Sequence, residues 1–218
     1  MKKKQTHFIR ASFVILAFVM LGYVVKFYPE AIKGFDSNIQ TTVRGNLPAG
    51  LTSFFKVITS LGSEIGIFIY TLALAIFFYF KKSWKMEGYL LFGNLVLMGI
   101  LSTLFKYLYN RSRPNLTYLI PRPMGPSFPS WHAASTLIVA MSLAVIIGQR
   151  LANKFLVRLL QVLLILLAFL TALSRIYLGV HYPTDILAAW LLAIAQLSFV
   201  YPFYDQKRFE WRFKSKQK

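Results

Sequence analysis

The sequence of 218 residues contains no cysteine and only seven acidic residues. Without cysteine, a disulfide framework, a zinc–thiolate site and an iron–sulfur cluster are excluded. Charged residues make up 15% of the chain, against roughly 25% in an average soluble protein. Hydrophobic residues make up 56% and arrive in long runs. This composition excludes an intrinsically disordered chain, a coiled coil and most soluble enzymes.

The net charge of +18 comes from 25 lysine and arginine residues. In a soluble chain such a charge would indicate nucleic-acid binding. Here the basic residues cluster between apolar segments, which is the pattern of membrane topology. We therefore expect membrane lipids, and no nucleic acid, among the partners of this protein.

Six apolar segments are long enough to cross a bilayer, for which about 20 residues are needed. They cover residues 8–27, 64–80, 87–105, 132–148, 157–173 and 185–202. No segment alternates like a barrel strand, so we expect an all-α bundle of six transmembrane helices. By length the chain is one domain, residues 1–218.

Two details of this layout have alternatives. The first segment follows three lysines and so also resembles a signal peptide, but no small-x-small cleavage site follows, and we expect a retained span. Residues 51–61, which Gly62 separates from the second span, are interpreted as an interfacial helix. Residues 35–43, in the first outer loop, form an amphipathic patch that also fits a membrane surface.

The orientation follows from the basic residues, most of which fall in the two termini and two of the loops. The positive-inside rule places those segments in the cytoplasm. Both termini are then cytoplasmic, and the long, proline-rich loop of residues 107–131 lies on the extracytoplasmic face of the cell membrane.

Three short stretches, at the outer ends of the third to sixth spans, carry reactive side chains. The side chains we single out are Lys106, Arg113, Ser130, Trp131, His132, Arg175, His181 and Asp185. Helix ends that are distant in sequence can meet in a bundle. We therefore expect one site at the outer face.

The cations of this set favour an anion. Lys106, Arg113 and Arg175 at one depth would repel each other strongly unless an anion occupied the space between them. Guanidinium groups bind phosphate oxygens in a bidentate manner. Ser130 adds a hydroxyl donor at the predicted start of the fourth span, where free backbone amides also favour an anion.

The two histidines fit phosphoryl transfer. His181 and Asp185 are four residues apart, so at helical spacing their side chains face each other. A carboxylate on one ring nitrogen leaves the other nitrogen free as a nucleophile. His132 has no acidic neighbour and fits a general acid that later activates water.

Taken together, the pattern Lys-x6-Arg-Pro, Pro-Ser-x-His and Ser-Arg-x5-His-x3-Asp resembles the three-part signature of the type-2 phosphatidic acid phosphatase family, which shares its catalytic architecture with the vanadium haloperoxidases. The resemblance covers residues 106–185. It implies a nucleophilic His181 that forms a phosphohistidine, oriented by Asp185, with His132 as general acid. It implies a phosphate cradle of Lys106, Arg113, Ser130 and Arg175, and no metal or other cofactor.

One position departs from the family pattern. The residue between the serine and histidine of the second stretch is usually glycine, whereas here it is Trp131. Glycine lets the backbone approach the phosphate closely. The tryptophan leaves open a crowded entrance, reduced activity, an altered substrate choice, an engineered substitution or an interfacial anchor.

The sequence thus predicts a membrane lipid phosphatase that cleaves a phosphomonoester or pyrophosphate. Undecaprenyl diphosphate is the favoured substrate, with phosphatidylglycerophosphate, phosphatidic acid and diacylglycerol pyrophosphate as competitors. A lipid phosphotransferase and a non-catalytic lipid-binding or lipid-translocating protein are the alternatives. Each residue taken alone also fits an ordinary structural role, such as a snorkelling Lys106 or a purely stabilising His181–Asp185 pair.

Overall fold

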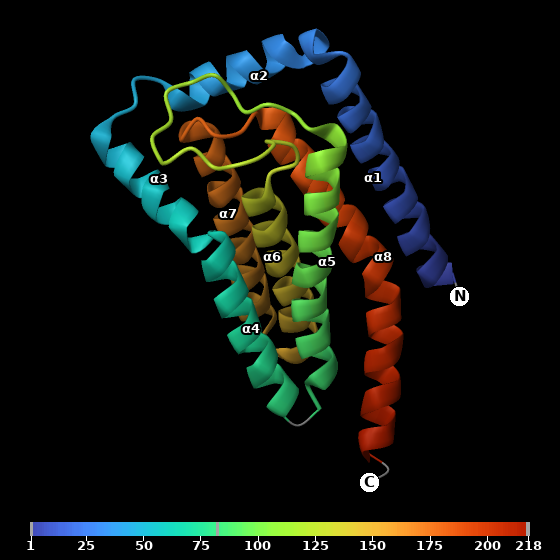
Figure 1. The fold of residues 1–218 in the computed structure, drawn as a ribbon. Helices are drawn as coiled ribbons and strands as arrows, with labels where there is room; N and C mark the ends of the chain where they lie inside the picture. The colour runs from blue at the N-terminus through green and yellow to red at the C-terminus, as the bar shows by residue number, and fades with distance from the viewer. Residues whose placement is uncertain (1, 82, 217–218) are drawn as a thin grey trace.

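A computed structural model describes residues 2–81 and 83–216. This part of the chain is all-helical, with eight helices and no strand (Figure 1). The helices are α1 (Lys2–Phe27), α2 (Pro29–Arg44), α3 (Ala49–Leu61), α4 (Glu64–Phe80), α5 (Lys85–Tyr109), α6 (Trp131–Arg150), α7 (Lys154–Tyr177) and α8 (Pro183–Lys216). The predicted all-α class is confirmed.

Five of these helices, α1, α5, α6, α7 and α8, are long and apolar enough to cross a membrane. The pair α3 and α4 passes the same test when it is taken as one span with a bend of 47°. A methyl group at Gly62, in the bend, would meet Thr171 Cγ2 at 2.5 Å and Thr136 Cγ2 at 2.9 Å. Glycine is therefore required where the bend packs against α6 and α7.

The last helix is longer than the sequence predicted. We expected the sixth span to end at Pro202, but α8 continues through it to Lys216. Proline removes one backbone hydrogen bond of a helix and need not end it. Beyond Pro202, ion pairs one turn apart join Asp205 to Arg208 at 3.2 Å and Lys207 to Glu210 at 3.0 Å.

Polar contacts join the central helices at mid-bundle. Asn94 on α5 donates to Ser142 Oγ on α6 at 2.9 Å. Gln196 on α8 donates to the Asn94 carbonyl at 2.8 Å. All three side chains are buried, so these bonds satisfy polar groups that would be costly to leave unpaired among apolar helices.

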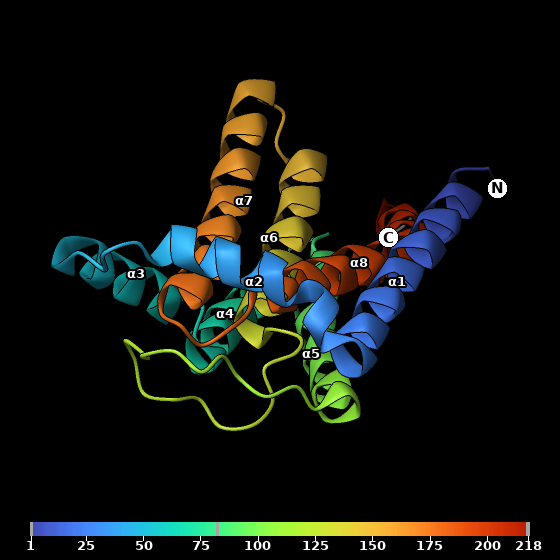
Figure 2. The ribbon, with the colours of Figure 1, turned by 90° about the horizontal axis from the view of Figure 1, so that it is seen from above.

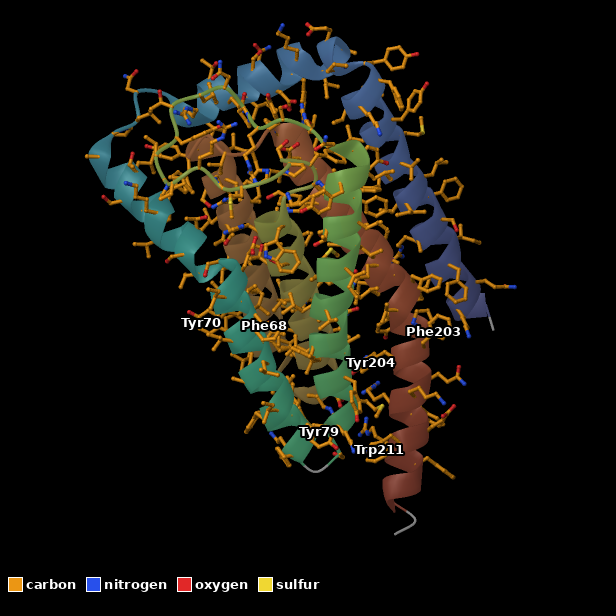
Figure 3. The ribbon with its side chains drawn as sticks, in the orientation of Figure 1. Phe68, Tyr70, Tyr79, Phe203, Tyr204 and Trp211 are labelled. Carbon is orange, nitrogen blue, oxygen red and sulfur yellow. The ribbon has the colours of Figure 1, made fainter. Side chains whose placement is uncertain are left out.

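The two ends of the bundle differ in what covers them. Helix α2 lies across one end, next to the long loop of residues 110–130, while both termini point toward the other end (Figures 1 and 2). The buried residues of α2 are Asp36 and Gln40, and the partly buried Ile32 and Val43 of the same helix pack against the hydrophobic core. Figure 3 shows Tyr79 and Trp211 near the opposite end, and the Lys85 ammonium lies 4.3 Å and 5.4 Å from their ring centroids.

Candidate active site

The pair of His181 and Asp185 lies where α7 passes into α8. His181 Nδ1 is 3.1 Å from Asp185 Oδ2, and this oxygen also accepts a 2.9 Å bond from the Tyr182 N–H. The side chains do meet, but not as two positions of one helix, because α8 begins at Pro183 and His181 precedes it. Asp185 reaches back from the first turn to the residues before the helix.

This arrangement leaves Nε2 of His181 directed at cations. Arg113 Nη1 lies 3.3 Å from it. Burial lowers the pKa of His181 well below its ordinary value, and the positive charges of Lys106, Arg175 and Arg113 lower it further. The imidazole is therefore neutral near pH 7, and with the proton on Nδ1 the lone pair is on Nε2.

Arg113 and Lys106 meet at the carbonyl groups of the long loop. In this loop, Arg113 Nε donates to Gly125 O at 3.1 Å and Lys106 Nζ donates to Pro126 O at 2.7 Å. Arg113 Nη1 also donates to Val180 O, between α7 and α8, at 3.0 Å. Burial lowers the pKa of Arg113 below its ordinary value. Carbonyl oxygens are neutral, so these contacts hold the two cations without cancelling their charge.

Arg175, at the end of α7, is only 3% exposed. Its Nη1 donates to Thr59 Oγ1 on α3 at 2.7 Å. Its Nε is buried and has no partner among the described residues. A buried donor without an acceptor is costly, and an anion beside it would supply one.

Ser130 and His132 begin α6 beside this group. The Ser130 hydroxyl oxygen accepts from the Ala133 N–H at 3.5 Å and so caps the helix. The Ser130 N–H donates to Asp185 O at 3.2 Å, which ties the start of α6 to the start of α8. His132 interacts electrostatically with Arg175, His181, Lys106 and Arg113. The three predicted stretches therefore converge on one place.

Comparison with known proteins gives the family of this chain. Residues 67–209 match the family model of the PAP2 superfamily. The chain belongs to the PAP2 superfamily. It is 30% identical over 185 residues to an undecaprenyl-diphosphatase of Sulfolobus acidocaldarius, covering 82% of this chain and 84% of that protein. It is also 30% identical over 199 residues to phosphatidylglycerophosphatase B of Bacillus subtilis, covering 89% and 94%.

A solved structure has the same architecture. The crystal structure of the transmembrane PAP2 type phosphatidylglycerolphosphate phosphatase from Bacillus subtilis superposes with a TM-score of 0.81 and 23% identity, over 91% of this chain and 96% of that one. This likeness shows a shared fold. Together with the family match and the relatives, it makes the protein a membrane lipid phosphatase of the PAP2 superfamily.

In this PAP2 protein, the indole of Trp131 packs against α5. A methyl group at Gly99 would lie 3.4 Å from its Cη2 atom, which is an ordinary van der Waals contact, so the ring lies directly beside this position of α5. The ring packs against the hydrophobic core of the bundle. Its Nε1 is buried without a partner among the described residues. This packing between helices argues against the interfacial anchor, which was one of the alternatives that the sequence left for Trp131.

Two charged residues that the sequence did not single out also touch this region. Arg111 contacts Asp185 at 2.7 Å, and Asp36 on α2 contacts Arg111 at 2.7 Å. The scarcity of acidic residues was the available signal, because in so basic a chain each of the seven is a candidate partner for a buried cation. Among the described residues, no group of three or more histidine and carboxylate side chains is arranged to hold a metal ion.

Proposed function

We propose that this PAP2 phosphatase hydrolyses a lipid phosphate or diphosphate at the extracytoplasmic face of the cell membrane, through a phosphohistidine at His181. The observation that carries the proposal is the neutral imidazole of His181, which is paired with Asp185 and lies beside Arg113. The positive charges of Lys106 and Arg175 also act on this imidazole. A nucleophile and an anion-binding group thus occur together.

In the first step, the lone pair of His181 Nε2 forms a bond to phosphorus, and the bond from phosphorus to the departing oxygen breaks. That oxygen stays on the lipid when the substrate is a phosphomonoester, and on the lipid monophosphate when the substrate is a diphosphate. His132 gives a proton to the departing oxygen. The imidazole of His181 keeps its Nδ1 proton and becomes cationic, and the adjacent Asp185 stabilises that charge.

In the second step, His132 takes a proton from water while the water oxygen bonds to phosphorus. The nitrogen–phosphorus bond breaks, inorganic phosphate leaves, and both histidines return to their starting forms. Lys106, Arg113, Arg175 and the Ser130 hydroxyl hold the phosphate oxygens, whose charge increases toward the transition state.

The lipid tail has a place directly below this site. An apolar cavity of about 210 Å³ lies between α4, α6 and α7. Two of its lining residues, Thr136 and Thr171, lie one helical turn from His132 and Arg175. A substrate with its head group among the cations would have an apolar passage for the start of its chain.

Undecaprenyl diphosphate is the substrate we favour, because a relative with that activity aligns over most of both chains. The phosphatidylglycerophosphatase relative makes phosphatidylglycerophosphate the main competitor. Phosphate release from these two lipids, phosphatidic acid and diacylglycerol pyrophosphate, measured side by side in detergent with a chelator present, ranks the four.

The mechanism is tested with His181→Ala. We expect phosphate release from every lipid to fall to background, because the nucleophile is gone. His7→Ala is the matched control, since His7 lies against Tyr201, near the other end of the bundle. Undiminished release by His181→Ala would reject the mechanism, as would an equal loss in His7→Ala.

A further inference from the structure

A second group of buried charges lies on the other side of Asp185 from His181. At its centre is Arg111, which occupies the six-residue gap between Lys106 and Arg113 and has no role in the sequence pattern. Its Nη1 donates to Asp185 Oδ1 and to Thr184 Oγ1, both at 2.7 Å. Its Nη2 donates to Asp36 Oδ2, also at 2.7 Å.

Asp36 brings helix α2 into this group. Its Oδ1 accepts from the Thr184 N–H at 2.9 Å, and its Oδ2 accepts from Thr184 Oγ1 at 2.8 Å. Thr184 is in the first turn of α8, where backbone N–H groups have no partner within their own helix. Asp36 is 2% exposed, so it caps α8 from a helix about 150 positions away in sequence.

Both carboxylate oxygens of Asp185 therefore have hydrogen-bond partners. Oδ1 is bound by Arg111, and Oδ2 is bound by His181 and the Tyr182 N–H. The Arg111 guanidinium also lies 3.8 Å from the centroid of the Tyr182 ring. A carboxylate fixed at both oxygens cannot rotate away from the imidazole.

Arg111 has two carboxylate partners, whereas its neighbour Arg113 has none among its hydrogen-bond acceptors in the described part of the chain. Burial lowers the pKa of Arg111, but the carboxylates of Asp185 and Asp36 outweigh burial and raise it above its ordinary value. Arg113 has carbonyl acceptors and the His181 ring as its partners. Arg113 can therefore attract an anion, whereas Arg111 is already neutralised by two.

We propose that Arg111 and Asp36 are positioning residues that hold the Asp185 carboxylate against Nδ1 of His181. The proposal rests on the proposed function of His181. With Asp36 and Asp185 ionised and Arg111 charged, the group carries one net negative charge. When His181 becomes cationic on bonding to phosphorus, the net charge of the assembly becomes zero. Helix α2 is thereby part of the catalytic apparatus.

The test compares Arg111→Met with Arg113→Met, two residues along the same loop, using undecaprenyl diphosphate in detergent. We expect Arg111→Met to lower kcat about 100-fold with KM changed less than threefold, because the phosphate-binding cations remain. Arg113→Met should raise KM and weaken the thermal stabilisation that inorganic phosphate gives, which Arg111→Met should retain.

Asp36→Asn keeps the shape of the side chain and serves if Arg111→Met does not fold. We expect it to lower kcat about tenfold, and to have little further effect in the Arg111→Met background, since the two residues act through one carboxylate. Guanidinium ion should partly restore kcat to Arg111→Ala and leave Arg113→Ala unrestored.

The outcomes separate the two proposals. If His181→Ala is inactive while Arg111→Met and Asp36→Asn keep the wild-type kcat, the positioning role is wrong and the nucleophile stands. Additive losses in the double variant, or a loss confined to KM, would also overturn the positioning role. If His181→Ala is active, the proposed function itself fails.

Discussion

The two ends of the bundle each bury an arginine, but only one end neutralises all of its buried cations. At the end away from α2, Arg150 on α6 pairs with Glu87 on α5 through Nε at 2.7 Å and also binds the Ser83 carbonyl. Its guanidinium lies 4.7 Å from the Trp84 ring centroid. Glu87 is fully buried, so this pair is closed to ligands.

At the other end, three cations lack such a partner. Within the described part of the chain, the hydrogen-bond acceptors of Lys106, Arg113 and Arg175 are carbonyl oxygens, a hydroxyl group and an imidazole. Asp185 and the exposed Glu64 influence Lys106 only through space. The buried arginine at the first end thus has a carboxylate partner, whereas the cations at the second end leave room for the anion that we propose.

Among the arginine variants, the largest effect we expect comes from Arg175→Met, at the end where these three cations have no carboxylate partner among the described residues. It should lower kcat/KM about 10³-fold, because a donor aimed at the phosphate in the transition state is lost. Unfolding in detergent should be little changed, since no carboxylate is left unpaired. Phosphate release and thermal unfolding, measured on the same sample, check both parts.

The rise in unfolding temperature caused by inorganic phosphate tests whether Arg175 contacts the anion. A ligand at 100 times its Kd adds about 2.7 kcal/mol to the stability of the folded state. We expect a clear shift in the wild type and a much smaller one in Arg175→Met. An equal shift in both proteins would place the anion elsewhere.

At the end that holds Arg150 and Glu87, we expect a substitution to affect stability and not kcat. Arg150→Met should destabilise the protein by about 3 kcal/mol, because Glu87 is left as an unpaired buried charge. The kcat of the folded fraction should be unchanged. Adding Glu87→Leu should recover most of the stability, which unfolding in denaturant measures. A loss of kcat in the folded enzyme would show that the two ends are coupled.

The uncompensated cations also affect proton binding by His181. Burial, Lys106, Arg175 and Arg113 keep its pKa well below the ordinary value, so its imidazole should stay neutral as the pH falls from 7.5 to 5.5. An unperturbed histidine would be about 90% protonated at pH 5.5. ¹⁵N-histidine spectra of the ligand-free protein in nanodiscs, assigned with His181→Ala, would show this.

The same pKa shift has a defined effect on stability. The unfolded chain binds a proton near pH 6.5 and the folded chain does not, so this residue makes the protein less stable as the pH falls below that value. Arg113→Gln should move the onset of His181 titration to higher pH, by less than the full shift, because burial is the larger cause. Titration of wild-type His181 near pH 6.5 would contradict the geometry.

Much of the fold and the arrangement of the site could be predicted from the sequence, and the reason is chemical. Apolar runs locate the spans, and Lys106, Arg113, His181 and Asp185 are types of residue whose order and spacing together indicate phosphate chemistry. These side chains interact electrostatically in the structure because the ends of their helices meet at one side of the bundle.

What could not be predicted depends on contacts between distant segments. Asp36 lies in an amphipathic patch that suggests a surface helix, and only its bonds to Arg111 and Thr184 show that it faces inward. The apolar run placed the sixth span at residues 185–202, and nothing in it predicted that α8 continues to Lys216. The Trp131 ring lies beside Gly99 on α5, a contact between segments that no local pattern connects.

The smallest effect we expect is on stability, at the contact between Trp131 and Gly99, which lies between the cationic end and the apolar part of the bundle. A methyl group at Gly99 would lie 3.4–3.5 Å from the Trp131 ring, an ordinary contact. Gly99→Ala should therefore stabilise α5 by about 0.5 kcal/mol and leave KM unchanged. Gly62→Ala is the opposing control, because its methyl group would meet Thr171 at 2.5 Å and should destabilise the protein. If Gly99→Ala changed KM instead, the indole would reach the entrance of the site, and Trp131 would act on substrate choice.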